Sequence, residues 1–388
     1  MGFSSRTPDD LSPNPITEVL GRLKSGSFLD LTVSNPTQCG FEYPKDLFQG
    51  LNSPQVMSYE PDPFGNMMAR EAVSGYLRDK GHRVGPSNLL LTASTSEAYS
   101  YIFKLLGNPE DSFLVPAPGY PLLDHLLQLD SLEPLPYSLR AEPNWPVDLN
   151  EAKKLPRANT KGLIVVNPQN PTGCFLSPNE QTALLNLCLN RQLAYISDEV
   201  FSDFPYPGHG LAMNPTSEVL SFRLGGLSKS LGLPQLKLSW IAIDGPKNLL
   251  SDCLERLELI ADTYLSVNTP VQLALEELLR FAPNFQKQVL ERVLRNRSVL
   301  EESFKALAEV KVWPAQGGWY ALVEVQKKGV RDDELVIQLL EKQGVFVQPG
   351  GFYDFQSSCF LVLSLLAKSA DFIEGVRRIH DFLNELKN

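Results

Sequence analysis

The chain has 388 residues, of which 43% are hydrophobic and 21% charged, and its formal net charge is −10 at pH 7. This length predicts more than one domain, and the excess of acidic residues excludes a surface that neutralises a nucleic-acid backbone. The five cysteines and four histidines are scattered without the spacing of metal ligands, which argues against a metal site.

The sequence also bears on where the protein works. No apolar run approaches the ~18 residues of a membrane span, and the polar stretch Met1 to Asp10 lacks a secretory signal. The cysteines are odd in number and scattered along the chain, which fits a reducing compartment where disulfides are rare. We therefore expect a cytoplasmic protein with no membrane or nucleic-acid partner.

Short apolar runs alternate with longer helical patterns through the middle of the chain, which predicts βαβ units and a mainly parallel sheet. Thr95 or Ser96 is the expected N-cap of the first helix, and Ser177 with Glu180 is typical of a capping box. Sheets of this doubly wound kind bind ligands at the carboxyl ends of their strands. The expected strands are 88–92, 112–116, 162–166, 193–197 and 238–243, and the expected helices between them are 96–106 and 178–191.

The last third of the chain reads as a smaller α+β unit. A long amphipathic helix, 283–309, is expected to begin it, followed by the segment 313–325, a helix at 332–343, a strand near Phe346 and a helix at 370–386. We therefore divide the chain into an N-terminal segment that packs on the small domain, a large domain and a small C-terminal domain, with the ranges 1–44, 45–280 and 281–388.

Lys229 follows a candidate strand and is surrounded by small and apolar residues in Leu227-Ser-Lys-Ser-Leu-Gly-Leu. An ammonium group at such a place loses hydration, so we expect its pKa to fall and the neutral, nucleophilic amine to become accessible. Lysines of this kind form Schiff bases with aldehydes such as pyridoxal phosphate. An ordinary surface lysine on a loop is the alternative interpretation of a lone Ser-Lys pair. Motifs elsewhere in the chain are needed to distinguish it from a Schiff-base lysine.

Three more polar motifs fall at the ends of successive candidate strands. Each of them alone could be a turn or a helix cap, but all of them in this order are far less expected by chance. They are Thr92-Ala-Ser-Thr-Ser-Glu-Ala, Asn167-Pro-Gln-Asn-Pro-Thr-Gly and Ser197-Asp-Glu.

With these motifs, the chain from about Leu31 to Leu366 resembles the pyridoxal-phosphate-dependent aminotransferases of fold type I, the aspartate aminotransferase superfamily (class I/II). The resemblance implies an α/β fold, with a mainly parallel doubly wound sheet in a large domain that binds pyridoxal 5'-phosphate (PLP) and a smaller α+β domain. It implies that Lys229 holds PLP as an internal aldimine and, once freed, shuttles the substrate proton. Asp198 matches the carboxylate that keeps the pyridine nitrogen protonated.

The resemblance assigns the remaining contacts to PLP. Asn170 matches the asparagine that donates to the phenolic oxygen, and Tyr120 matches the aromatic residue that stacks on the pyridine ring. The phosphate is expected at a helix N-terminus, with Tyr59 reaching it from the neighbouring subunit of a homodimer. The residues expected around the phosphate in the same chain are Ser94, Thr95, Ser96, Ser228 and Lys237.

The chain departs from the family pattern at four positions. Lys237 stands where an arginine is usual, Gly226 where a serine is usual, and Phe201 where a tyrosine donates to the phenolic oxygen. Val362 occupies the position of the arginine that clamps the substrate α-carboxylate, and the alternatives are an alignment slip or a compensating arginine from elsewhere in the chain. We therefore hypothesise a substrate that is an amine or an unusual amino acid.

The resulting function is an aminotransferase that moves an amino group from an amino acid or amine to a keto acid. A PLP-dependent lyase or decarboxylase on the same fold is the alternative, because the same carbanion can eliminate a substituent or lose carbon dioxide. A regulatory module that keeps the fold without activity is a third possibility. Trp319 and Tyr320 either line the substrate side of the site or belong to the core of the small domain.

Overall fold

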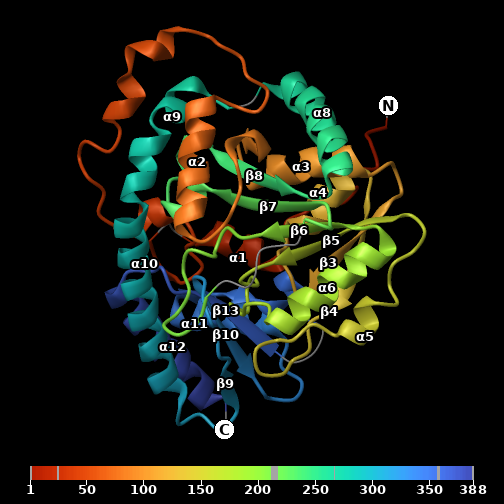
Figure 1. Ribbon diagram of the computed structural model, residues 1–388. Helices are drawn as coiled ribbons and strands as arrows, with labels where there is room; N and C mark the ends of the chain where they lie inside the picture. The colour runs from red at the N-terminus through yellow and green to blue at the C-terminus, as the bar shows by residue number, and fades with distance from the viewer. Residues whose placement is uncertain (1, 24–25, 211–216, 266, 356–358, 387–388) are drawn as a thin grey trace.

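The computed structural model describes residues 2–23, 26–210, 217–265, 267–355 and 359–386. Its main feature is a seven-stranded sheet in the order β2-β8-β7-β6-β5-β3-β4 (Figure 1). All neighbouring strands are parallel except β8, which runs antiparallel to both β2 and β7. The expected mainly parallel α/β fold is thus confirmed. The strands are β2 (Leu89–Thr92), β3 (Ser112–Ala117), β4 (Glu133–Ser138), β5 (Thr160–Val166), β6 (Ala194–Asp198), β7 (Ser221–Gly226) and β8 (Ser239–Asp244).

Helices cover both faces of this sheet, which explains why its strands are continuous apolar runs. On one face Leu90, Phe222 and Ile241 pack against α3 (Thr95–Leu106) and α8 (Lys247–Tyr264). On the other face, Leu163 and Tyr195 pack against α6 (Pro178–Arg191). Other helices around the sheet are α2 (Met67–Asp79), α4 (Leu123–Leu129), α5 (Leu149–Ala152), α7 (Leu227–Ser230) and α9 (Thr269–Leu273).

The N-cap of α6 is the expected residue, whereas that of α3 is not. Ser177 and Glu180 form the expected capping box at the start of α6. The N-cap of α3 is Ser94, and not Thr95 or Ser96 as the sequence suggested. The hydroxyl of Ser94 accepts a hydrogen bond from the Glu97 N–H at 3.1 Å, so the helix begins one residue earlier than expected.

A second, four-stranded antiparallel sheet in the order β12-β13-β10-β9 lies below the large sheet in Figure 1. It packs with the two helices α11 and α12 around a core of its own. The N-terminal segment joins this unit, because β1 pairs in parallel with β11 and Leu31 is buried in the same core. The elements are α1 (Pro15–Arg22), β1 (Leu29–Asp30), β9 (Val310–Val312), β10 (Tyr320–Val325), α11 (Asp332–Gln343), β11 (Val345–Phe346), β12 (Gln348–Pro349), β13 (Cys359–Ser364) and α12 (Ser369–Glu385).

The long helix α10 (Leu275–Phe304) connects the two units, and it differs from the expected helix at 283–309. Pro283 lies inside it, although a proline removes one backbone hydrogen bond. Leu275 and Leu278 pack in the core beside the large sheet, whereas Phe285 packs in the core of the small unit. Burial on both sides of the proline offsets the lost bond, so the helix continues through it. The domain boundaries at 44 and 280 stay a prediction.

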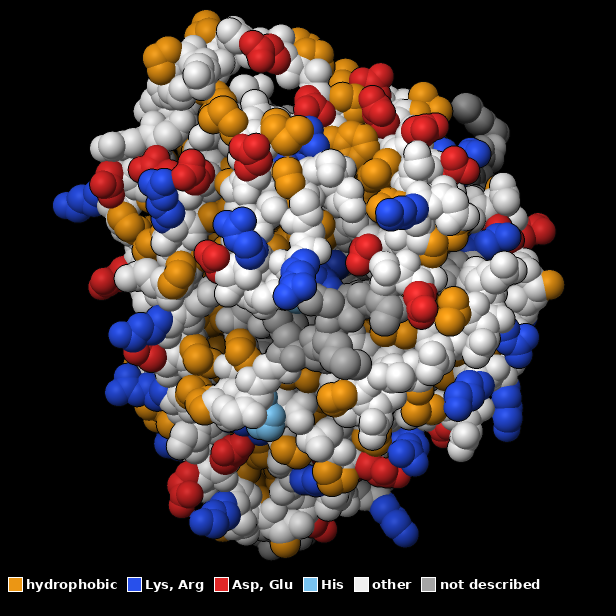
Figure 2. All heavy atoms as spheres, in the orientation of Figure 1, with side chains coloured by type: hydrophobic (Ala, Val, Ile, Leu, Met, Phe, Trp, Pro, Cys, Tyr) orange, Lys and Arg blue, Asp and Glu red, His pale blue; other side chains and the backbone are white. Residues whose placement is uncertain are grey.

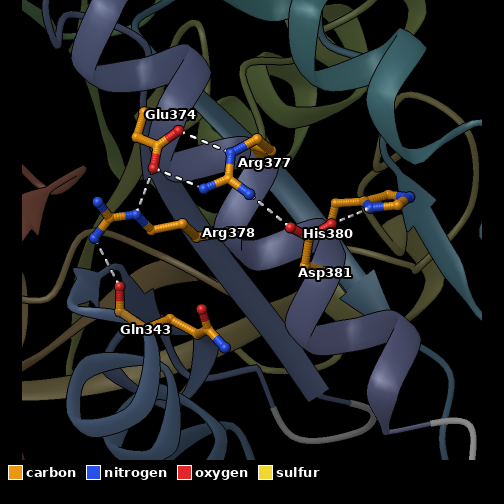
Figure 3. Close-up of polar contacts among 6 residues, drawn as sticks. All are labelled: Gln343, Glu374, Arg377, Arg378, His380 and Asp381. Carbon is orange, nitrogen blue, oxygen red and sulfur yellow. Dashed lines mark hydrogen bonds and ion pairs between the residues drawn. The ribbon is translucent and has the colours of Figure 1, made fainter.

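The C-terminal helix is held by charged side chains on its surface (Figure 3). Arg378 binds the Glu374 carboxylate through Nε at 2.8 Å, and its Nη1 donates to the Gln343 carbonyl at the end of α11 at 2.9 Å. Arg377 binds both Glu374 and Asp381. The guanidinium groups lower the pKa of Glu374 to about 2, so this network persists across the neutral pH range.

The molecular surface is mixed in charge. On the face in Figure 2, Lys and Arg side chains are interspersed with Asp and Glu side chains. Among the described helices, none is long and apolar enough to cross a bilayer. No group of three or more potential metal ligands occurs in the ranges that the structure describes.

Candidate active site

Four expected site segments meet at one edge of the large sheet. Asp198 is the last residue of β6, and Lys229 lies in α7 directly after β7. Asn170 follows β5, and Ser94 follows β2, which runs in the same direction because β8 is antiparallel to both β2 and β7. The carboxyl ends of these strands therefore converge, as expected for a ligand site of a doubly wound sheet.

The amine of Lys229 is surrounded by aromatic rings. Its Nζ lies 5.1 Å from the ring centroid of Trp319 and 5.5 Å from that of Phe201. Burial lowers the pKa of Lys229 to about 8, while the nearby Asp198 carboxylate acts in the opposite direction. A neutral, nucleophilic amine is therefore available near physiological pH, as the surrounding sequence suggested.

The carboxyl group of Asp198 is buried, with 5% of the residue exposed. Burial raises its pKa to about 6, but hydrogen bonds from the Val200 N–H at 3.2 Å and the Tyr99 hydroxyl at 3.1 Å favour the ionised form. Most of the carboxylate is therefore ionised at pH 7 and can stabilise a cation such as a protonated ring nitrogen. Sequence reasoning missed Tyr99, whose only signal is its place one helical turn after Thr95.

Asn170 has an amide oxygen, Oδ1, that is buried and has no hydrogen-bond partner among the described residues. The neighbouring Gln169 holds the turn, because its Oε1 accepts from the Asn170 N–H at 2.9 Å and its Nε2 donates to the Pro118 carbonyl at 2.5 Å. A buried acceptor without a partner costs free energy, so a hydrogen-bond donor bound next to Oδ1 would stabilise the fold. Sequence reasoning missed Gln169.

Tyr120 follows the loop that Gln169 anchors and is half-buried. Burial raises the pKa of Tyr120 to about 12, and the negative charge of Asp198 adds to this effect. The phenol ring is therefore neutral and lies near Asp198, where a flat heterocycle bound to that carboxylate could stack on it.

The N-terminus of α3 offers backbone donors for an anion. The Thr95 and Ser96 N–H groups lie in its first turn, where no intrahelical acceptor exists. The Ser94 hydroxyl already accepts from the Glu97 N–H, so it contributes to the helix cap. Ser228 lies in α7 beside Lys229 and is half-buried.

Lys237 and Tyr59 are both on the surface of the chain. Lys237 is exposed, has a left-handed backbone with φ 52° and forms no ion pair with the residues that the structure describes. Tyr59 is 71% exposed and lines a surface pocket together with Asn66, Tyr101 and Thr269. A side chain that exposed is available to a second subunit.

Val362, at the position of the expected carboxylate-binding arginine, is 1% exposed. It packs in a hydrophobic cluster with Trp145, Trp313 and Phe360, and its register partner on β10 is Leu322. Lys311 Nζ lies 3.2 Å from the ring centroid of Trp313, so charged groups do border this cluster. Position 362 itself supplies no cation for a substrate carboxylate.

The aromatic residues Trp319 and Tyr320 follow Gly318 and lie close to Phe201. Trp319 is fully buried in the core of the small unit, and its ring centroid lies 5.1 Å from Lys229 Nζ. Tyr320 is half-buried, with its ring centroid 6.0 Å from that of Phe201. Phe201 itself is buried and packs edge-on against Trp319 at 5.3 Å.

This donor set fits PLP. The aldehyde would meet the Lys229 amine, the ring nitrogen the Asp198 carboxylate, the ring face Tyr120 and the phosphate the N-terminus of α3. The unpartnered Asn170 Oδ1 calls for a donor, whereas the phenolic oxygen of PLP would bond to the amide N–H of the same side chain.

Comparisons with known proteins agree with this geometry. The family model for aminotransferase class I and II matches residues 23–365. The alanine aminotransferase of Mycobacterium tuberculosis is 28% identical over 384 residues, which cover 95% of this chain and 89% of that protein. The glutamate-pyruvate aminotransferase AlaA of Haemophilus influenzae is 25% identical over 376 residues, with 94% and 92% covered.

Solved structures show the same fold. An alanine aminotransferase from Pyrococcus furiosus superposes with a TM-score of 0.85 at 24% sequence identity, covering 92% of both chains. A Thermus thermophilus aspartate aminotransferase mutant gives 0.84 at 20% identity, covering 98% of this chain and 99% of that one. The relatives support amino-group transfer over the lyase or decarboxylase alternative. The chain therefore belongs to the class I and II aminotransferases and is a PLP-dependent enzyme of this family.

Proposed function

We propose that Lys229 and Asp198 are the catalytic residues of this aminotransferase. The Lys229 amine, with a pKa of about 8, would hold the PLP aldehyde and, when free, would accept the proton from the substrate Cα. Bound PLP supplies an electron sink for the charge left on that carbon. The Asp198 carboxylate holds a proton on the ring nitrogen, and its ionised form is supported by the Tyr99 hydrogen bond.

The other proposed residues bind and orient the cofactor. Asn170 donates its amide N–H to the phenolic oxygen, and Tyr120 supports the ring face. Backbone donors at Thr95 and Ser96 bind the phosphate. The hydroxyls of Ser94 and Ser228 and the ammonium of Lys237 complete the phosphate site in this proposal. Lys237 neutralises charge without the bidentate geometry of an arginine.

Covalent labelling tests the assignment of Lys229. PLP is added to the purified protein, the adduct is reduced with borohydride and the labelled peptide is mapped. We expect the label on Lys229 and its loss in Lys229→Ala. Lys237→Ala is a matched control, because it removes a lysine of the same site that is assigned to the phosphate. A label on another lysine in the wild-type protein would contradict the assignment.

For the substrate, we propose an amine or an unusual amino acid rather than a standard α-amino acid held by an arginine. The observation that supports this is the apolar cluster around Val362. Aromatic side chains gather beside Lys229 and Asp198, with Phe201 near Tyr320 and Tyr320 near Tyr120. Aromatic walls favour a substrate with a sizeable apolar group.

A paired substrate panel tests this proposal. Each amino acid is compared with the amine that lacks its carboxylate, for example phenylalanine with phenethylamine, and amino-group transfer is followed by the spectral change of the cofactor. Without an arginine clamp, we expect kcat/KM to differ by less than about tenfold within a pair. Relatives are named alanine, glutamate-pyruvate and tyrosine aminotransferases, so these amino acids belong in the panel. Efficient turnover of alanine, glutamate or tyrosine, with the paired amine more than a thousandfold poorer, would reject the proposal.

We further infer that the enzyme works as a homodimer in which Tyr59 reaches the phosphate of the neighbouring subunit. Tyr59 is exposed, and it is accompanied on the surface by Met57, Met68 and Leu265, which are 87%, 61% and 53% exposed. Exposed apolar side chains of this kind favour a covered face. Sedimentation of the purified protein tests the oligomer, and a monomer that is fully active would contradict it.

A further inference from the structure

The backbone of Gly226, directly before α7, has no room for a side chain. A Cβ atom added there would lie 2.8 Å from Ser239 Cβ and closer still to its hydroxyl oxygen. Real Cβ atoms essentially never approach other atoms so closely. The Ser239 side chain therefore occupies the space that a side chain on residue 226 would fill, although it comes from the adjacent strand.

The sheet register shows where this hydroxyl points. Ser239 is the first residue of β8 and lies between Thr92 of β2 and Gly226 of β7. In the row two residues further into the sheet, Ile241 and Leu224 pack against the helices α3 and α8. Because side chains alternate between faces, Ser239 points to the same face as this row, the one covered by α3.

The same row reaches the N-terminus of α3. The Thr92 hydroxyl, beside Ser239 in the register, donates to the carbonyl of Ser94, the N-cap of that helix, at 3.0 Å. On the other side, Gly226 leads into α7, which carries Ser228 and Lys229. Ser239 thus lies between the two segments that are proposed to bind the phosphate.

The hydroxyl of Ser239 has no hydrogen-bond partner among the residues that the structure describes. Ser239 is 1% exposed, and its backbone is paired with the neighbouring strands. By contrast, the Thr92 hydroxyl is already engaged with a backbone carbonyl. A buried hydroxyl without a partner costs free energy unless a ligand supplies the missing hydrogen bond.

We propose that the Ser239 hydroxyl donates a hydrogen bond to the phosphate of PLP, from the place that a side chain on residue 226 would otherwise take. The inference rests on the proposed phosphate site at the N-terminus of α3 and adds to it a ligand from β8. It also accounts for Gly226, because the site has room for one side chain and Ser239 provides it.

The test compares binding of PLP with binding of pyridoxal, which lacks the phosphate, to the cofactor-free protein. Dissociation constants are measured by absorbance titration. In Ser239→Ala we expect the Kd for PLP to rise roughly tenfold or more and the Kd for pyridoxal to stay within about twofold. Ser221→Ala is the matched control, because Ser221 is a buried serine at the other end of β7, whose hydroxyl donates to Asp244. It should change neither constant.

Exchanging the two residues provides a second test that does not depend on the alanine variant. Gly226→Ser alone should weaken PLP binding, because its side chain collides with Ser239. The double variant Gly226→Ser/Ser239→Gly removes the two shortest contacts, leaving the Cα of residue 239 at 3.0 Å, and returns one hydroxyl to the same space. Its Kd for PLP should therefore come back to within about threefold of the wild-type value.

The outcomes separate this inference from the proposed function. If wild-type protein binds PLP and Ser239→Ala binds it equally well, the Ser239 contact is wrong and the rest of the site stands. Equal weakening of PLP and pyridoxal would also reject the contact, since the serine would then act on the fold or on Lys229. If the wild-type protein itself binds no PLP, the proposed site as a whole is wrong.

Discussion

The Tyr99 hydroxyl donates a hydrogen bond of 3.1 Å to Asp198, and Tyr99 belongs to the same helix, α3, whose first turn is proposed to bind the cofactor phosphate. One helix thus organises both ends of the site. Its N-terminus offers backbone donors, and one turn later its tyrosine supports the carboxylate that faces the ring nitrogen. A change in Tyr99 should therefore act on catalysis through Asp198.

Replacing Tyr99 by phenylalanine removes a hydrogen bond that favours the ionised carboxylate. The pKa of Asp198, about 6 because of burial, should rise further, so the acid limb of the rate profile should move to higher pH. At pH 7 we expect roughly a three- to tenfold loss of kcat/KM. Tyr137→Phe is the control, because that buried hydroxyl donates to the Ile164 carbonyl. An unmoved acid limb in Tyr99→Phe would contradict the role.

Replacing Asp198 by asparagine should stabilise the cofactor-free protein and impair the enzyme. The folded-state pKa of about 6 lies above the ordinary value of 3.8 because burial disfavours the charge. Burial of the charged carboxylate lowers the free energy of unfolding fully above the folded-state pKa of about 6 and not at all below 3.8. Asp198→Asn should therefore be more stable than the wild type at pH 7 and equally stable near pH 4. The gain in stability should not exceed about 3 kcal/mol.

Thermal and denaturant unfolding of cofactor-free wild type and Asp198→Asn at both pH values measures this gain. In the same variant, aminotransferase activity should fall roughly a hundredfold or more, because the ring nitrogen loses its counter-charge. A variant that is less stable than the wild type at pH 7 would show that the carboxylate is not penalised by burial.

Lys229 should react as a neutral amine at a lower pH than surface lysines do. Burial lowers its pKa to about 8, whereas an ordinary lysine titrates near about 10.4. In the cofactor-free protein, the rate of acylation at Lys229, followed by peptide mapping, should therefore rise through about pH 8. Asp198→Asn should shift this rise to lower pH, because the carboxylate supports the ammonium form. A rise only near the ordinary value would contradict a desolvated amine.

Placing an arginine at position 362 should destabilise the protein instead of restoring a carboxylate clamp. Val362 packs with Trp145, Trp313 and Phe360, so the guanidinium would lose its hydration. The buried Glu324 carboxylate on the same face of the sheet already accepts from Trp313 Nε1 and the Gln326 amide. We expect a loss of about 3–5 kcal/mol in the free energy of unfolding. Val362→Met, which adds an uncharged side chain nearly as long as arginine, should cost about 1–3 kcal/mol through overpacking alone.

Denaturant unfolding of both variants provides the measurement, and turnover of amino acids against their paired amines is recorded alongside. If Val362→Arg were as stable as Val362→Met and gained activity toward α-amino acids, the position would face the substrate after all. The substrate proposal would then lose its main support.

The sequence alone determined most of the fold class and the main candidate residues. Strand–helix alternation follows from local periodicity, and motifs such as the one around Lys229 are contiguous in the chain. Both can therefore be read without knowing any long-range contact. The capping box at Ser177 was predictable for the same reason, since its two partners are three residues apart.

Only the tertiary structure decided the relationships between distant segments. Ser239 fills the space beside Gly226 because β7 and β8 are neighbours in the sheet, and no local sequence pattern predicts that pairing. Likewise, α10 passes through Pro283 because two cores hold it, which overrides the local preference to break. Local helix propensities differ by less than about 1 kcal/mol for most residues and by about 3 kcal/mol for proline, so burial against distant partners determines the outcome wherever the two compete.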